Sequence, residues 1–310
     1  MPATARLPSA DTNAETVQRI AAFMGEFSLE ATKLSAADIA ALQGVVPERT
    51  SVYLTALPSR PAVSVIEPAR RLRAAGFEPV PHLAVRSIAS AGVLDDLLSG
   101  LAALAGVRSV LVVAGDRDRP AGPFANAIEV IESGLLQRYG INEVGIAGYP
   151  EGHPRISPLV LDRALAAKVE AAAQTGLAVH IVTQFCFDAM AVLDWIVRLR
   201  DLGIEHPVRI GMAGPTDLST LLRYAHRCGV RASAQGLSRH AGLLKHLVGT
   251  SAPDGIIRPL AEATADGRFG QVVPHFYSFG GVAATGRWAA AIAAGRVVLD
   301  RAQGFGVEPL

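Results

Sequence analysis

The 310-residue sequence has little cysteine, few aromatic residues and almost no net charge. Its two cysteines, Cys186 and Cys228, lie far apart and in no metal-ligand spacing, which argues against a disulfide framework and a zinc site. The net charge of +1 provides no field that would attract nucleic acid or an anionic membrane. Two reduced thiols are consistent with a cytoplasmic protein, and we expect neither a nucleic-acid nor a membrane partner.

Long apolar runs are also missing, although 50% of the residues are hydrophobic. Each apolar stretch is broken by Gly, Pro or charge well before the roughly 20 residues that a membrane-spanning helix needs. Residues 1–13 contain no apolar core of the kind a secretory signal requires, so we interpret them as a frayed leader. The basic run at 70–73 falls on an expected helix, where a solvated face is the simplest interpretation.

Short β-like runs recur along the chain with helical patterns between them, which is typical of repeated βα units and a parallel sheet. The expected strands are Glu26–Glu30, Ser51–Ala56, Pro79–Ala84, Ser109–Ala114, Glu143–Tyr149, Val179–Gln184, Val208–Met212 and Val272–Phe276. They predict an α/β protein with a single-domain (β/α)8 TIM barrel over 21–310, preceded by a leader or extra helix at 1–20. A Rossmann sheet is the main alternative, but no Gly-x-Gly-x-x-Gly turn follows the first strand.

Local end signals mark several of the helices. Ser35 to Asp38 form a capping-box-like start, with Asp in place of Glu or Gln. Amphipathic helices are expected at Asp95–Ala105, which ends at Gly106, at Asp162–Ala173, and at Asp188–Leu202, which ends at Gly203. The interval from Met212 to Val272 should hold two helices and an irregular piece near Pro253–Gly255.

Polar residues collect where the expected strands end, which in a barrel is the side of the active site. They are Glu30, Tyr53, Thr55, His82, Gly115, Asp116, Tyr149, His153, Gln184 and Tyr277. No defensible Ser/His/Asp order and no typical metal cluster occurs among them, so covalent hydrolysis and metal catalysis are disfavoured. A mouth of carboxylates, amide and hydroxyl donors and a Tyr/His/Pro wall suits a bound organic cofactor.

The segment Ala147–Pro154 places a tyrosine, a glutamate and a histidine directly behind a strand-like run. Its prolines stiffen the turn, and its glycines let the backbone approach a ligand closely. A plain Pro/Gly turn explains the segment about equally well. In the same way, Glu30 can be a solvated strand end, His82 a satisfied core histidine and Asp116 a turn residue.

At these residues the chain resembles the short catalytic-barrel form of the methylenetetrahydrofolate reductase family, from about Gly25 to about Gly281. The motifs that carry the resemblance are Ala147-Gly-Tyr-Pro-Glu-Gly-His-Pro154, Val182-Thr-Gln-Phe-Cys-Phe-Asp188, Pro81-His-Leu83, Ala114-Gly-Asp116 and His275-Phe-Tyr277. The resemblance implies a non-covalently bound FAD, reduced by NADH or NADPH and reoxidised by 5,10-methylenetetrahydrofolate in a ping-pong cycle. It also implies a homo-oligomer, either a dimer or a tetramer.

The resemblance further implies roles for individual residues. Glu30 matches the family's general acid, for which we expect a raised pKa at a partly desolvated strand end. Asp116 matches the aspartate beside flavin and pterin, while Gln184 and Tyr224 match residues that contact the reductant. The folate contacts would be Gln184, Asp116, Tyr277 and Thr220. The FAD contacts would be Tyr53, Leu54, Ala56, His82, Ala114, Gly115, Asp116, Phe124, Ala125, Tyr149, His153, Asp162 and Lys168, with the lysine facing the phosphates.

Two departures from the family pattern affect the expected substrate. Ala31–Leu34 replace the two aromatics and two prolines that usually follow the acid, and Gly281 replaces an arginine that would contact the folate. These differences leave open a related flavin barrel for another pterin or one-carbon substrate, and a non-catalytic pterin-binding barrel. The choice between NADH and NADPH is open as well.

Overall fold

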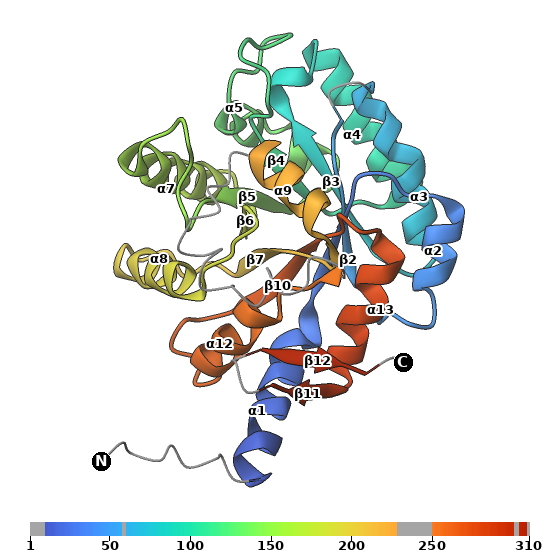
Figure 1. The fold of residues 1–310 in the computed structure, drawn as a ribbon. Helices are drawn as coiled ribbons and strands as arrows, with labels where there is room; N and C mark the ends of the chain where they lie inside the picture. The colour runs from blue at the N-terminus through green and yellow to red at the C-terminus, as the bar shows by residue number, and fades with distance from the viewer. Residues whose placement is uncertain (1–9, 58–59, 228–249, 301–303, 309–310) are drawn as a thin grey trace.

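The computed structural model describes residues 10–57, 60–227, 250–300 and 304–308. Its centre is a closed barrel of parallel strands in the order β1-β10-β7-β6-β5-β4-β3-β2, with helices around it (Figure 1). The barrel strands are β1 (Ser28–Ala31), β2 (Ser51–Leu54), β3 (Glu78–Ala84), β4 (Ser109–Val113), β5 (Glu143–Gly148), β6 (Ala178–Thr183), β7 (Val208–Ala213) and β10 (Val272–Tyr277). The predicted (β/α)8 barrel is confirmed.

The helices alternate with these strands along most of the chain. They are α1 (Ala10–Phe23), α2 (Ala36–Leu42), α3 (Ile66–Ala74), α4 (Ala91–Ala105), α5 (Ala127–Glu132), α6 (Leu135–Arg138), α7 (Pro158–Gln174), α8 (Ala189–Asp201), α9 (Leu218–Arg227), α12 (Asp254–Thr264) and α13 (Val282–Ala293). Two short antiparallel pairs, β8 (Thr216–Asp217) with β9 (Thr250–Ser251) and β11 (Val297–Leu299) with β12 (Phe305–Val307), lie outside the barrel. Within the described ranges, none of the helices has the length and apolar character needed to cross a membrane.

Three of the predicted helix-end signals, at Ser35, Gly106 and Asp188, are confirmed, whereas α4 and α7 begin at Ala91 and Pro158, four residues before the predicted starts at Asp95 and Asp162. Ser35 and Asp38 form a reciprocal capping box at the start of α2. Asp188 accepts hydrogen bonds from the first backbone N–H groups of α8, and Gly106 ends α4 in the left-handed conformation that glycine adopts without strain.

The structure also corrects three expectations. Met24–Glu26 form a 3-10 helix that continues α1, so β1 begins at Ser28 rather than at Glu26. α1 already starts at Ala10 and packs against α12 and α13, so residues 10–13 belong to a helix rather than to a frayed leader. Asp254 opens α12, where its charge suits the positive end of the helix, so the piece expected to be irregular is a helix start. The rest of the long interval, including Cys228, lies outside the described residues.

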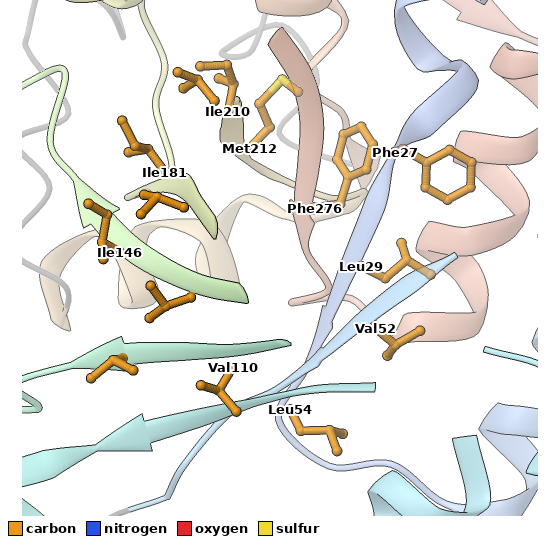
Figure 2. Close-up of a cluster of buried hydrophobic side chains, with 14 of the residues drawn as sticks. Phe27, Leu29, Val52, Leu54, Val110, Ile146, Ile181, Ile210, Met212 and Phe276 are labelled. Carbon is orange, nitrogen blue, oxygen red and sulfur yellow. The ribbon is translucent and has the colours of Figure 1, made fainter. Parts of the chain in front are cut away.

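Side chains alternate between the two faces of the barrel wall, as the two-residue period of a strand requires. The outward residues pack against the helices in one large apolar core. They include Leu29, Val52, Leu54, Val110, Ile146, Ile181, Ile210, Met212 and Phe276 (Figure 2). Their neighbours in sequence point inward, and many of these are polar or aromatic: Ser28, Glu30, Tyr53, His82, His180, His275 and Tyr277. The inner face of the barrel therefore carries the hydrogen-bonding and titratable side chains, while its apolar outer face stabilises the fold.

Two glycines on the inner wall make room for these large rings. A Cβ on Gly145 would lie 2.6 Å from Nε2 of His180, and a Cβ on Gly211 would lie 2.8 Å from Cε2 of Tyr277. Any larger residue at either position would collide with a ring that takes part in the inner hydrogen bonds.

Candidate active site

A carboxylate between two histidines lies at the carboxyl end of the barrel. Glu30 on β1 is 8% exposed, and its Oε1 accepts a hydrogen bond from Thr55 Oγ1 at 3.1 Å. Its Oε2 lies 3.3 Å from Nε2 of His275 on β10 and 3.5 Å from Nε2 of His82 on β3. We refer to Glu30, Thr55, His82 and His275 as the Glu30 cluster. The barrel brings these four residues together from strands far apart in the sequence.

The electrostatics of the Glu30 cluster favour a charged carboxylate. Burial raises the pKa of Glu30, but the charge of His82 and the hydrogen bonds from His275 and Thr55 outweigh it and hold the pKa below its usual value. Burial lowers the pKa of both histidines, while Glu30 opposes that shift. The expected raised pKa of Glu30 is therefore wrong, because the sequence pattern did not place two imidazoles on the carboxylate.

His82 is the member of the cluster that has a ring nitrogen without a hydrogen bond in the described part of the chain. Its Nε2 is buried and has no hydrogen-bond partner among the residues that the structure describes. His275, in contrast, is held on both sides, since its Nδ1 lies 2.9 Å from Ser28 Oγ. A polar ligand atom next to Glu30 would satisfy the unpaired nitrogen of His82.

A second hydrogen-bonded chain runs below the cluster toward the amino ends of the strands. The Tyr53 hydroxyl lies 2.8 Å from Nε2 of His180, and Nδ1 of His180 lies 2.9 Å from Oε1 of Glu143. Because the carboxylate of Glu143 can only accept, Nδ1 carries the proton and Nε2 accepts from Tyr53. Burial raises the pKa of Tyr53, so its hydroxyl keeps its proton, and the hydrogen bond from His180 lowers the pKa of Glu143.

The hydrogen bond to His180 limits which parts of Tyr53 can contact a ligand. Its side chain is fully buried and its hydroxyl is engaged with His180, while its ring packs edge-on against His275 with 4.6 Å between ring centroids. Tyr53 therefore forms a floor beneath the Glu30 cluster. Any contact with a cofactor would involve its ring or backbone.

The residues after β4 and β5 form one wall of the site. The rings of Tyr149 and His153 meet edge-on with 5.4 Å between centroids. Burial and, to a smaller extent, the charge of Asp116 raise the pKa of Tyr149, which places the exposed Asp116 near that ring. Asp116 follows Gly115, whose φ of +85° is one that glycine adopts readily.

Glu151 has a structural rather than a catalytic position in this wall. Its Oε1 accepts the backbone N–H groups of Phe187 at 2.6 Å and Asp188 at 2.8 Å. Burial raises its pKa, although these two hydrogen bonds oppose the shift. The glutamate thus ties the segment 147–154 to the start of α8, and so fixes the loop that carries Gln184.

Lys168 is a half-buried cation on α7. Its Nζ lies 3.5 Å from the carbonyl oxygen of Ala147, and no ion pair to it is found in the part of the chain that the structure describes. Burial lowers its pKa to about 8. A half-buried ammonium of this kind favours an anionic partner such as a phosphate.

An aromatic group lies on the opposite side of the mouth. Phe279, just after β10, stacks on Tyr224 of α9 with 4.1 Å between centroids and 10° between planes, and on Tyr277 at 5.8 Å and 27°. Phe185 contacts Phe279 and Tyr277 edge-on, and its backbone N–H donates to the side-chain oxygen of Gln184. Three of the five positions expected to contact substrate or reductant, 184, 224 and 277, are thus joined through Phe185 and Phe279.

The remaining predicted contacts lie at the periphery. Leu54 faces the helices, so only its backbone can face the site, and Phe124 is buried. Ala125 is exposed, with its carbonyl accepting from Arg86, and the backbone N–H of Thr220 donates to Asp217. Ala56 lies two residues after β2, Ala114 directly follows β4, and Asp162 lies in the first half of α7. No group of three metal-ligating side chains occurs in the described ranges.

Sequence reasoning missed three of these features. His275 and His180 are strand residues, and no local signal indicates their partners. Phe279 lies two residues after β10, so its position near a strand end was the available signal. Their roles emerge only from pairings between distant strands.

Comparisons with known proteins identify one enzyme family. A family model described as methylenetetrahydrofolate reductase matches residues 31–243, a range that leaves Glu30 and β10 outside. Methylenetetrahydrofolate reductase 2 of Saccharomyces cerevisiae is 29% identical over 161 residues, covering 48% of this chain and 26% of that relative. The match therefore spans only about a quarter of that relative's length.

A solved structure shares the fold. It is a Clostridium thermocellum protein described as binding two copies of 5-methyl-5,6,7,8-tetrahydrofolic acid, with a TM-score of 0.58 and 10% identity. The alignment covers 89% of this chain and 96% of that one. At this identity the likeness concerns the fold alone.

Proposed function

Because this chain belongs to the methylenetetrahydrofolate reductase family, we propose that it reduces 5,10-methylenetetrahydrofolate to 5-methyltetrahydrofolate, with FAD as cofactor and NADH or NADPH as reductant. The observation that carries the proposal is the Glu30 cluster, a buried carboxylate flanked by two histidines at the catalytic end of the barrel. The names of the yeast relative and the folate-binding neighbour support the choice of a folate substrate.

The residues of the mouth suit FAD. Lys168 offers a half-buried ammonium for the phosphates, and the Tyr149–His153 pair offers an aromatic wall for a planar ring. The unpaired Nε2 of His82 is available as a hydrogen-bond partner. When bound, FAD supplies the group that accepts a hydride from the nicotinamide and passes it to the folate.

In this proposal the Glu30 cluster moves the proton. Opening the five-membered ring of the folate requires a proton on the departing nitrogen, and Glu30 is the acidic side chain of the cluster. In the free protein the pKa of Glu30 lies below its usual value, so the side chain is a carboxylate there. A bound folate that excludes water would raise this pKa, as burial does, so Glu30 would take up a proton from solvent as the complex forms and pass it to the departing nitrogen.

Charge also favours the open form of the substrate. Ring opening leaves a cationic iminium, and two acidic side chains, Glu30 on β1 and Asp116 after β4, lie at the carboxyl end of the barrel. Negative groups that are already in place stabilise such a cation without reorganisation. Gln184 would orient the folate through its amide.

An alternative substrate within the same chemistry is favoured by Gly281. This residue precedes α13 with a φ of +106°, and a Cβ built there would meet no atom within 4 Å. A site without an arginine at this place suits a pterin whose tail is bound elsewhere. Anaerobic mixing of photoreduced protein with 5,10-methylenetetrahydrofolate separates the two substrates, because a reduced flavin that stays reduced favours the other pterin.

The cofactor part of the proposal is tested by an absorption spectrum. Purified protein, after incubation with excess FAD and desalting, should retain a flavin spectrum, and anaerobic NADH or NADPH should bleach it. A protein that stays colourless after reconstitution overturns the proposed flavin chemistry. A cytoplasmic location and a dimeric or tetrameric state belong to the same proposal, and light scattering tests the second.

A further inference from the structure

The Phe279 ring fills a place that is shaped for a flat ring. It stacks on Tyr224 at 4.1 Å with almost parallel planes, and on Tyr277 at 5.8 Å. Phe185 supports it edge-on at 5.3 Å. Planar heteroaromatic ligands bind to tyrosine rings in this same arrangement, because stacking is tolerant of ring identity.

The backbone that carries Phe279 is held in place on both sides. The N–H of Ser278 donates to the carbonyl oxygen of Glu30 at 3.2 Å. A Cβ on Gly280 would lie 2.1 Å from the carbonyl oxygen of Pro215, so the chain is tightly packed there. Departure of the ring from the stack would therefore require rotation about its own side-chain bonds rather than movement of the loop.

A positive charge accompanies the stack. The guanidinium carbon of Arg223 lies 5.7 Å from the centre of the Tyr224 ring, on an exposed side chain of the same helix. A cation beside stacked tyrosines complements a planar ring that carries an anionic group. Both a nicotinamide dinucleotide and a folate have this combination.

We propose that Phe279 is an internal substitute for the ligand ring, and that it must rotate off Tyr224 and Tyr277 before a nicotinamide or pterin ring can stack there. The inference rests on the proposed function, because it concerns the same ligands. It makes Phe279 a residue that sets ligand affinity. The stacking free energy of one aromatic pair corresponds to a change of about 2- to 10-fold in the dissociation constant of a ligand that competes with it.

The test compares wild type with Phe279→Leu and Phe279→Ala in the full-length, FAD-treated protein. The flavin is first photoreduced, so that binding of the reduced nicotinamide is not followed by hydride transfer. Anaerobic calorimetry then measures the dissociation constants of NADH, NADPH and 5-methyltetrahydrofolate separately, so the nicotinamide and pterin arms are distinguished. Leu222→Ala is the matched control, since Leu222 is an exposed apolar residue on the same helix. Both Phe279 variants should bind at least one of these ligands about 2- to 10-fold more tightly than wild type, with the control unchanged.

The other outcomes of this binding experiment separate failure of the inference from failure of the proposed function. If the variants bind the ligands with unchanged or weaker affinity while wild type binds them, Phe279 is a bystander or a platform for the ligand, and this inference fails alone. If neither wild type nor variants bind any of the three ligands, the inference and the proposed function fail together. Binding by the variants but not by wild type supports the inference.

Discussion

Replacing Tyr53 with phenylalanine should lower the free energy of unfolding by about 1–3 kcal/mol and leave FAD affinity unchanged. Tyr53 is fully buried, and its hydroxyl donates to Nε2 of His180 at 2.8 Å. Removing the hydroxyl leaves that nitrogen buried without a donor, and an unsatisfied buried group typically costs about 1–3 kcal/mol. The ring, which packs against His275, is retained.

Urea denaturation followed by circular dichroism provides the free energies through linear extrapolation. Tyr139→Phe is the control, because the Tyr139 hydroxyl bonds Asp95 at the surface and its loss should change stability little. FAD affinity is measured on the same samples by fluorescence. A Tyr53→Phe protein of wild-type stability that binds FAD poorly would refute the reasoning, since the hydroxyl would then serve the cofactor and not the core.

Three further predictions concern protons. Glu30→Gln should slow flavin reoxidation by the folate by about 10²- to 10⁴-fold but spare reduction by NAD(P)H, and equal loss in both stopped-flow half-reactions would exclude the acid role. FAD affinity, measured by fluorescence, should fall as pH rises above about 8, where Lys168 loses its proton, whereas Lys168→Arg should bind FAD independently of pH in that range. His82, His180 and His275 have lowered pKa values in the fold, so the unfolded chain takes up protons first as pH falls below about 6.5. Tm should therefore decrease as pH is lowered from about 7.5 to about 5.5, and a constant or rising Tm would contradict this.

The barrel was predictable because its signals are local. Every barrel strand overlaps a predicted run, since most outward positions carry an aliphatic residue and the strands are followed by turns. Helix ends such as Ser35, Gly106 and Asp188 were also predictable, because capping depends on residues within one turn. The start of β1 was not, because residues 26–30 contain no local signal that separates the end of a 3-10 helix from the start of a strand.

The site was predictable only in part. Strand-end position and motif resemblance identified Glu30 and His82, which the structure brings within 3.5 Å of each other. The lowered pKa of Glu30 was not predictable, because it depends on His275, which is 245 residues away in sequence. The same holds for Phe279, whose role depends on a stack between a loop and a helix.

The most direct test of the proposed function is an anaerobic pair of half-reactions on FAD-loaded protein. Our account predicts that NADH or NADPH bleaches the flavin, and that 5,10-methylenetetrahydrofolate then restores its colour with formation of an equal amount of 5-methyltetrahydrofolate. A flavin that is reduced by the nicotinamide but not reoxidised by the folate would contradict the proposed substrate. A protein that does not retain FAD would contradict the proposed chemistry altogether.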